Sequence, residues 1–179
     1  MQRTLAIVGS LLFLVLAPGT VAGLIPWAIS GWRWQSALLG LMLFPWLGGA
    51  LIIAGIPILL ESFARFALQG LGTPAPLYPT DRLIVSGLYR FVRNPMYLAV
   101  LAIAFGQAFL LGDVRLIIYG AVVWLAFHVF VVTYEEPVLR RRYGAQFNTY
   151  CAQVPRWLPR LTPFSDPSSN LTRQPPLSS

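Results

Sequence analysis

Lysine is absent from this chain, and histidine and cysteine occur once each. All thirteen basic residues are arginines, which excludes Schiff-base chemistry on a lysine and a phosphate-binding loop that depends on lysine. The single histidine is His128 and the single cysteine is Cys151. These numbers exclude histidine-rich metal sites, paired-cysteine motifs, iron–sulfur clusters and disulfides within the chain. The sequence therefore predicts no bound metal.

Charged residues are also scarce, because they make up 11% of the 179 residues whereas 56% are hydrophobic. In a soluble domain, roughly a quarter of the residues are normally charged. The excess of apolar side chains needs lipid as its solvent, and the length allows one domain. The isoelectric point near 10.3 comes from arginines that flank apolar stretches, which indicates membrane topology and no nucleic-acid partner.

Four apolar stretches approach the roughly 20 residues that a membrane-spanning helix requires. They cover about residues 4–29, 36–60, 95–111 and 115–134. The three residues 112–114 leave room only for a tight turn, so the last two stretches are predicted to form an antiparallel hairpin. The predicted fold is an all-α, multi-pass membrane bundle of about four transmembrane helices.

The arginines set the predicted orientation. If the N-terminus is cytoplasmic, eleven arginines lie inside and only Arg33 and Arg115 lie outside, as the positive-inside rule requires. We therefore expect a protein of the cell membrane with both termini cytoplasmic. An alternative is that Arg3 and the apolar run after it form a cleavable signal peptide. The apolar run continues through Ile25 and Trp27, which favours a membrane helix.

Composition divides the chain into three predicted parts. Residues 1–62 form a two-helix membrane anchor. Residues 63–164 form a catalytic region made of a loop, the helical hairpin and a C-terminal cap. Glycine and proline are frequent between residues 63 and 94, so no long regular helix is expected there. Residues 165–179 are rich in proline, serine and asparagine and are predicted to be disordered.

The first polar cluster directly precedes the third apolar stretch. Pro95 suits the first turn of a helix and disfavours helical geometry at Asn94, so the loop stays open at that point. Free backbone N–H groups there, with Arg93 beside them, can bind a carboxylate or another anion. The alternative is a capped helix whose Arg93 side chain extends to lipid phosphate.

The second cluster, Glu135 and Glu136, ends the fourth stretch, where the negative end of the helix dipole disfavours adjacent carboxylates. A positive partner is expected, and Arg140 has the i,i+4 spacing from Glu136 that suits an ion pair. One interpretation is a purely structural ion network. The other is a carboxylate that binds ribose hydroxyls or the ammonium of a ligand. Pro137 is expected to kink the chain here.

His128 is an ionisable residue inside a predicted membrane helix, and such residues are functional candidates by default. It precedes Glu135 by seven residues and so lies on roughly the same helix face. It is either a functional group or a neutral histidine bonded to a neighbouring helix, with Gln107 as the expected polar partner. Glu61 is expected to pair with Arg65 at i,i+4.

Together the two clusters resemble a known family. The residues Gly87, Tyr89, Arg93, Asn94, Pro95 and Tyr97 are similar to the G-x-Y-x-x-x-R-H-P-x-Y motif of isoprenylcysteine carboxyl methyltransferases. The residues Glu135, Glu136, Leu139, Tyr143, Gly144, Phe147, Tyr150, Val154, Pro155 and Arg156 resemble the carboxy-terminal motif of the same family. The wider group includes phospholipid N-methyltransferases. The resemblance covers about residues 72–163, and one position departs from it, since Asn94 stands where the family has histidine.

The resemblance implies a membrane enzyme that uses S-adenosylmethionine as cofactor, held in a cytosol-facing pocket at the hairpin. Its partners would be membrane lipid and a lipid-soluble or small methyl acceptor. Arg93, Glu136 and His128 would be the catalytic residues. The cofactor-binding residues would be Tyr89, Arg93, Asn94, Pro95, Tyr97, Glu135, Glu136 and Tyr143. A lateral apolar opening marked by His128 and Gln107 is expected for the acceptor.

Two other functions fit parts of the sequence. An NADPH-dependent membrane reductase of the steroid reductase type has a related motif, and the arginines at positions 140–142 would suit the extra phosphate of NADPH. The Glu pair followed by the Tyr-Gly and Val-Pro-Arg elements favours the methyltransferase. A non-enzymatic scaffold or transporter gives no reason for two ordered polar clusters at one end of a hairpin.

Overall fold

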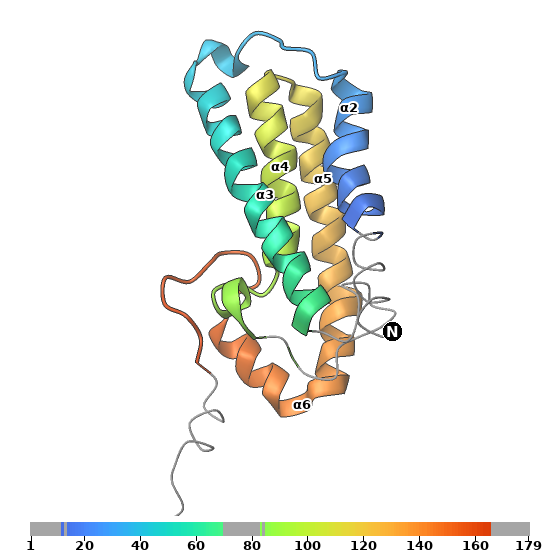
Figure 1. Ribbon diagram of the computed structural model, residues 1–179, viewed down its shortest axis with the longest axis vertical. Coiled ribbons are helices and arrows are strands. Elements are labelled where there is room, and N and C mark those ends of the chain that lie inside the picture. The colour runs from blue at the N-terminus through green and yellow to red at the C-terminus, as the bar shows by residue number, and fades with distance from the viewer. Residues whose placement is uncertain (1–11, 13, 70–82, 84, 166–179) are drawn as a thin grey trace, which may run out of the picture.

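The computed structural model describes residues 12, 14–69, 83 and 85–165, and within these residues every regular element is a helix (Figure 1). The first helical segment contains the π-helical turn η1 (Thr20–Leu24) and α2 (Ile25–Ser30). The 3-10 turn η2 (Leu38–Gly40) precedes α3 (Leu43–Gln69). The 3-10 turn η3 (Gly87–Arg90) precedes α4 (Pro95–Leu111). The chain continues through α5 (Val114–Phe130), the π-helical turn η4 (Val131–Glu135) and α6 (Glu136–Gln153).

Helices α3 and α4 pack closely along the bundle because small residues face each other. A Cβ atom on Gly48 would lie 2.4 Å from the backbone nitrogen of Leu110 and 2.5 Å from the carbonyl oxygen of Gly106. Two helix backbones can approach this closely only where a side chain is missing, as is common between helices in membranes. Helix α5 packs on the other side of α4, with α2 against α5 (Figure 1).

The predicted hairpin between the last two apolar stretches is confirmed. Gly112 ends α4 in the left-handed conformation with φ of 70°. Asp113 then caps α5, because its carboxylate accepts the backbone N–H of Arg115 at 2.9 Å and forms an ion pair with the guanidinium of the same residue at 2.7 Å. This compact turn holds α4 and α5 antiparallel.

Helix α5 continues through η4 directly into α6, with no loop between them. The N–H of Glu136 bonds to the carbonyl oxygen of Val131, five residues earlier, so η4 is a π-helical turn. Pro137 has no N–H to donate to the preceding turn, which is the physical reason for an irregular turn here. The backbone of Glu135 and Glu136 nevertheless stays helical, so the break in helical geometry lies at Gly144 and not at Pro137, where the kink was expected. Farther along, α6 bends sharply at Gly144, where φ is 52° and ψ is −124°, and turns back towards the bundle (Figure 1).

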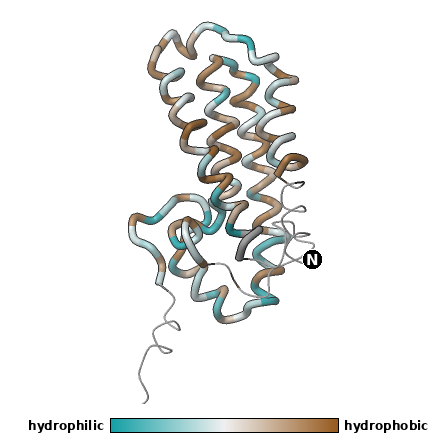
Figure 2. Tube along the Cα trace, viewed as in Figure 1, coloured by the Kyte–Doolittle hydropathy of each residue, from teal (hydrophilic) through white to brown (hydrophobic). Residues whose placement is uncertain are grey.

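Two helices are long and apolar enough to cross a membrane, at Leu43–Arg65 and Val114–Gln153, and shorter apolar helices cover Leu14–Ser30 and Pro95–Leu111. The outward faces of the bundle are apolar. Examples are Ile118, Val122 and Leu125 of α5, which are exposed. Hydrophobic residues predominate along the bundle, and hydrophilic ones occur at its two ends, including the end near α6 (Figure 2). An apolar outer surface of this kind is suited to lipid.

Some predicted boundaries need correction. The second helix begins at Leu43 rather than residue 36, because residues 36–42 form a loop with η2. It extends to Gln69, so the expectation that residues 63–69 are irregular is wrong. Glycine and proline become frequent only after Gln69, which explains the extension. Residues 1–11 of the first predicted stretch and residues 166–179 of the predicted tail lie outside the described residues.

Candidate active site

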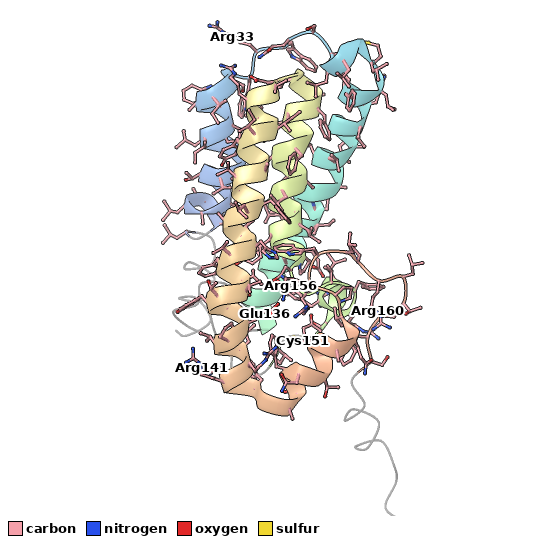
Figure 3. The ribbon with its side chains drawn as sticks, turned by 180° about the vertical axis from the view of Figure 1, so that it is seen from behind. Arg33, Glu136, Arg141, Cys151, Arg156 and Arg160 are labelled. Atoms are coloured by element: carbon pink, nitrogen blue, oxygen red, sulfur yellow. The ribbon has the colours of Figure 1, made fainter. Side chains whose placement is uncertain are left out.

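The loop before α4, the junction of α5 with α6 and the segment after α6 meet at one end of the bundle (Figure 3). We call residues 154–165 the C-terminal strap. Three backbone hydrogen bonds join the strap to the loop. The N–H groups of Arg93, Arg160 and Phe164 donate to the carbonyl oxygens of Pro155, Phe91 and Arg90 at 3.0, 2.9 and 2.9 Å. The strap therefore covers the loop that carries the first polar cluster.

An apolar cluster between α6, the strap and the loop holds the strap in place. Its buried members are Phe147, Tyr150, Val154 and Phe164, and Leu83, Val85 and Tyr143 pack against them. The bend of α6 at Gly144 brings the end of this helix back to the loop, so that the Tyr150 hydroxyl donates to the carbonyl oxygen of Tyr89 at 2.7 Å. The loop, α6 and the strap thus form one packed unit.

Glu136 is buried and is the centre of an ion cluster with two partly exposed arginines. Its Oε1 accepts Nη1 of Arg93 at 2.9 Å and Nε of Arg156 at 2.7 Å, and its Oε2 accepts Nη2 of Arg156 at 3.0 Å. Figure 3 shows Arg156 and Glu136 side by side, with Cys151 near them. Nη1 of Arg93 also lies 3.0 Å from Sγ of Cys151. One carboxylate between two guanidiniums leaves the cluster with one net positive charge.

The two adjacent glutamates differ in their environments. They follow the apolar part of the helix, which ends at Tyr134. Burial acts to raise the pKa of Glu136, but the hydrogen bond from Arg156 and the charges of Arg93 and Arg156 outweigh it and hold this pKa below its usual range. Burial raises the pKa of Glu135, although the Tyr97 hydroxyl donates to its Oε2 at 2.9 Å and opposes that shift. Glu136 is therefore the strongly ionised member of the pair.

Asn94 and Pro95 shape the loop as predicted, since Pro95 is the first residue of α4 and Asn94 has a non-helical φ of −123°. The Asn94 side chain does not cap the helix. Instead its Nδ2 donates to the carbonyl oxygen of Arg156 at 3.2 Å. Free backbone N–H groups were expected in this loop, but the N–H of Arg93 is not one of them, because it donates to the carbonyl oxygen of Pro155 in the strap.

The three tyrosines predicted to bind the cofactor have different surroundings. Tyr89 is buried, and burial raises the pKa of its hydroxyl far above the usual range. The ring of Tyr97 lies 4.7 Å from the ring of Phe127, between centroids. Tyr143 packs at the edge of the apolar cluster below the strap, with the guanidinium of Arg142 5.9 Å from its ring centroid.

His128 and Gln107 lie in different halves of the bundle, so the expected partnership between them is wrong. Nδ1 of His128 accepts the indole N–H of Trp157 at 3.1 Å. Gln107 accepts the indole N–H of Trp32 at 3.0 Å and donates to the carbonyl oxygen of Ala22 at 2.7 Å. In an antiparallel hairpin Gln107 is close to the turn whereas His128 is far from it, which separates the two side chains.

Two predicted ion pairs have opposite outcomes. Glu61 pairs with Arg65, as expected, and Nη1 of Arg65 also donates to the hydroxyl of Ser86 at 3.1 Å. Glu136 takes Arg93 and Arg156 as its partners instead of Arg140. A buried carboxylate gains more from a bidentate guanidinium that lies above it than from an exposed side chain on its own helix.

An open groove of about 450 Å³ lies beside this site, between α3 and η3. Its lining consists of Pro57, Ile58, Glu61, Gly87, Leu88, Arg90 and Phe91. Near the turn of the hairpin, Gln107 and Trp32 border a second, apolar cavity of about 320 Å³. The apolar opening beside the site is thus flanked by Glu61 and Arg90, whereas Gln107 belongs to the other cavity.

Arg156, Trp157 and Cys151 were not among the predicted site residues. Arg156 had a signal, since it belongs to the Val-Pro-Arg element of the carboxy-terminal resemblance. No sequence signal marked Trp157 or Cys151, because only the fold of the strap and the bend of α6 bring Trp157 to His128 and Cys151 to Arg93. No group of three metal-binding side chains occurs in the described part of the chain.

Comparisons with known proteins identify the family of the chain. The sequence model of a family described as phospholipid methyltransferase matches residues 43–146. The chain is 32% identical over 79 residues to protein-S-isoprenylcysteine O-methyltransferase B of Arabidopsis thaliana, which covers 44% of this chain and 40% of that relative. It is 32% identical over 78 residues to protein-S-isoprenylcysteine O-methyltransferase of Schizosaccharomyces pombe, covering 43% and 33%. The chain therefore spans less than half the length of either relative. No solved structure matches it significantly.

Proposed function

Because this chain belongs to the phospholipid methyltransferase family, we propose that it is an integral-membrane methyltransferase that uses S-adenosylmethionine. The observation that carries the proposal is the ion cluster of Arg93, Arg156 and the buried Glu136 at one end of the apolar hairpin. Both named relatives are methyltransferases, which gives the reductase alternative no support.

The residues of the cluster fit this cofactor chemically. Nε of Arg93 is buried and has no hydrogen-bond partner within the described residues, so a donor is left for a ligand carboxylate. Glu136 and Glu135 offer carboxylates for an ammonium or for ribose hydroxyls. Tyr89 and Tyr97 offer aromatic faces. An unpartnered buried guanidinium nitrogen is costly, and a ligand carboxylate would remove that cost.

In this proposal the protein contributes to catalysis by positioning the cofactor and by excluding water from the site. When bound, S-adenosylmethionine supplies a methyl group that its sulfonium has already activated. Arg93, Arg156 and Glu136 hold the polar part of the ligand, while the strap and the apolar cluster beneath it keep water from this end of the bundle. Asn94 keeps a hydrogen-bond donor at the position of the family histidine, whereas a role that needs a titrating imidazole is lost there.

We propose that the methyl acceptor is lipid-soluble and enters through the groove between α3 and η3. The groove has apolar walls, including Ile58 and Phe91, and the outer face of α3 beside it is exposed and apolar. A molecule dissolved in the bilayer can reach the end of the bundle along such a surface. Glu61 and Arg90 at the rim would meet the polar part of the acceptor.

Titration calorimetry with two ligands tests the cofactor. We expect the purified protein in detergent to bind S-adenosylhomocysteine, because Arg93 and Glu136 suit the carboxylate and ammonium that this product shares with the cofactor. We expect no heat of binding with NADPH. Binding of NADPH without binding of S-adenosylhomocysteine would establish the reductase instead.

We further propose that four helices cross the membrane, with both termini in the cytoplasm. Arg33 lies at the opposite end of the bundle from Glu136 and Arg160 (Figure 3). The two shorter apolar helices lie alongside the two long ones. The positive-inside rule places the arginine-rich end, which carries the active site, in the cytoplasm.

Cysteine labelling in whole cells measures this topology. In a Cys151→Ser background, Arg33→Cys should react with a membrane-impermeant maleimide in intact cells. Leu161→Cys, whose side chain is 98% exposed, should react only after permeabilisation, because the strap is expected inside. Reaction of both positions from the same side would exclude the proposed topology. Labelling of both in permeabilised cells is the control for accessibility.

A further inference from the structure

The strap is joined to the helical hairpin by two neighbouring residues with different contacts. Arg156 makes the bidentate ion pair with Glu136, and Trp157 directly after it donates a hydrogen bond to His128 of α5. Consecutive Cα atoms are about 3.8 Å apart, so a fixed Trp157 strongly limits where the backbone of Arg156 can lie. The contact between Trp157 and His128 therefore helps to hold Arg156 in the ion cluster, because the two strap residues are neighbours in the chain.

The hydrogen bond defines the state of the His128 ring. An indole N–H is a donor only, so Nδ1 of His128 must present its lone pair to Trp157. A neutral imidazole then carries its proton on Nε2. In this arrangement the lone pair of Nδ1 accepts the indole N–H and Nε2 already carries a proton. Neither nitrogen is therefore free to take a proton from the methyl acceptor. The geometry gives no support to a general base at this position.

Ring contacts strengthen the same connection. The rings of Trp124 and His128 are 5.6 Å apart between centroids, and those of His128 and Trp157 are 6.1 Å apart, with interplanar angles of 30° and 32°. His128 thus lies between an indole of its own helix and the indole of the strap. Such packing fixes the orientation of the imidazole and with it the position of the acceptor nitrogen.

We propose that His128 is a positioning residue. Through its hydrogen bond with Trp157 it fixes the position of the strap along the loop, so that Arg156 keeps its bidentate ion pair with Glu136. Two other hydrogen bonds of the strap depend on the same position, from the Asn94 side chain to the Arg156 carbonyl and from the Arg93 N–H to the Pro155 carbonyl. The ligand-binding part of the test rests on the proposed function, whereas the strap-position part does not.

Three variants separate the hydrogen bond from packing. Trp157→Phe keeps an aromatic ring and removes the donor. His128→Leu removes the acceptor. His128→Asn is the matched control, because the asparagine Oδ1 lies close to where Nδ1 was and can still accept the indole N–H. In the double variant with His128→Leu and Trp157→Phe, the effect should be no larger than in either single variant.

The first measurement is hydrogen–deuterium exchange of the full chain without ligand. In Trp157→Phe and His128→Leu we expect the amides of Arg93, Arg160 and Phe164, which join strap and loop, to exchange about 2- to 10-fold faster, the factor that one neutral hydrogen bond provides. Amides in the middle of α4 should exchange as in the parent. His128→Asn should retain the parent rates for the strap amides.

The second measurement is the affinity for S-adenosylhomocysteine, which we expect to fall by about 2- to 10-fold in the same two variants and to be retained in His128→Asn. Parent-like exchange of the strap amides in both Trp157→Phe and His128→Leu would overturn the proposal. So would faster exchange in His128→Asn equal to that in His128→Leu. If the parent itself fails to bind the ligand, the proposed function fails while the exchange data still decide the role of His128.

Discussion

Glu136→Gln is expected to lower the affinity for S-adenosylhomocysteine roughly 10- to 150-fold, which corresponds to the loss of a charge-assisted hydrogen bond of about 1.5–3 kcal/mol. Glu136 accepts three hydrogen bonds from two arginines. The neutral amide cannot accept all three, so Arg93 and Arg156 would repel each other and leave their positions. The variant would thus lose both a ligand contact and the geometry of the two guanidiniums.

Calorimetry on matched variants measures this effect. Glu61→Gln is the control, because Glu61 also pairs with an arginine, Arg65, but at i,i+4 on one helix and outside the cluster. Such a pair contributes about 0.3–0.5 kcal/mol, so its loss should change ligand affinity less than about 3-fold. Equal affinities of Glu136→Gln and the parent would exclude the cluster as the cofactor site.

Gly112→Ala is expected to destabilise the protein by about 2–4 kcal/mol, the largest stability effect that we foresee for a single methyl group. Gly112 has φ of 70°, a conformation that costs a residue with a side chain roughly 1–2 kcal/mol. In addition, its Cβ would lie 2.2 Å from the carbonyl oxygen of Ser36. The loop before α3 would have to move away from the turn of the hairpin.

Thermal unfolding in detergent, followed by tryptophan fluorescence, compares the variants. Gly49→Ala is the control, since a Cβ on this helical glycine of α3 meets no atom within 4 Å. It should leave the midpoint unchanged or raise it, because alanine is favoured over glycine in a helix by about 1 kcal/mol. An unchanged midpoint for Gly112→Ala would show that the described turn is wrong.

The features that the sequence predicted well are those with a local signal. Apolar runs interrupted by Gly112 and Asp113 define the hairpin, because a tight turn leaves the two helices no alternative to antiparallel packing. The motif with Arg93 and Asn94 could be placed at the start of a helix because Pro95 restricts the backbone before it. The comparisons then supported the family that these residues suggested.

The missed features depend on tertiary structure. Arg156 replaces Arg140 as the partner of Glu136, because a bend at Gly144 reverses α6 and carries the strap over the loop. No periodicity reveals such a reversal. The pairing expected between His128 and Gln107 failed for a different reason, because the predicted hairpin already implied that the two residues lie at different distances from the turn and hence at different depths.

The π-helical turn between α5 and α6 determines which glutamate faces the arginines. Its bond from Glu136 to Val131 spans five residues, so the turn accommodates one more residue than an α-helix would. One residue corresponds to about 100° of rotation about the axis. The turn therefore decides by what angle α6 is rotated about the helix axis relative to α5. A regular α-helix over the same residues would rotate Glu136 by about 100° and point it away from Arg93 and Arg156, whereas removal of one residue would restore an α-helix and leave the direction of Glu136 almost unchanged. The hydrogen-bond pattern of this segment, more than its length, therefore decides which glutamate meets the arginines.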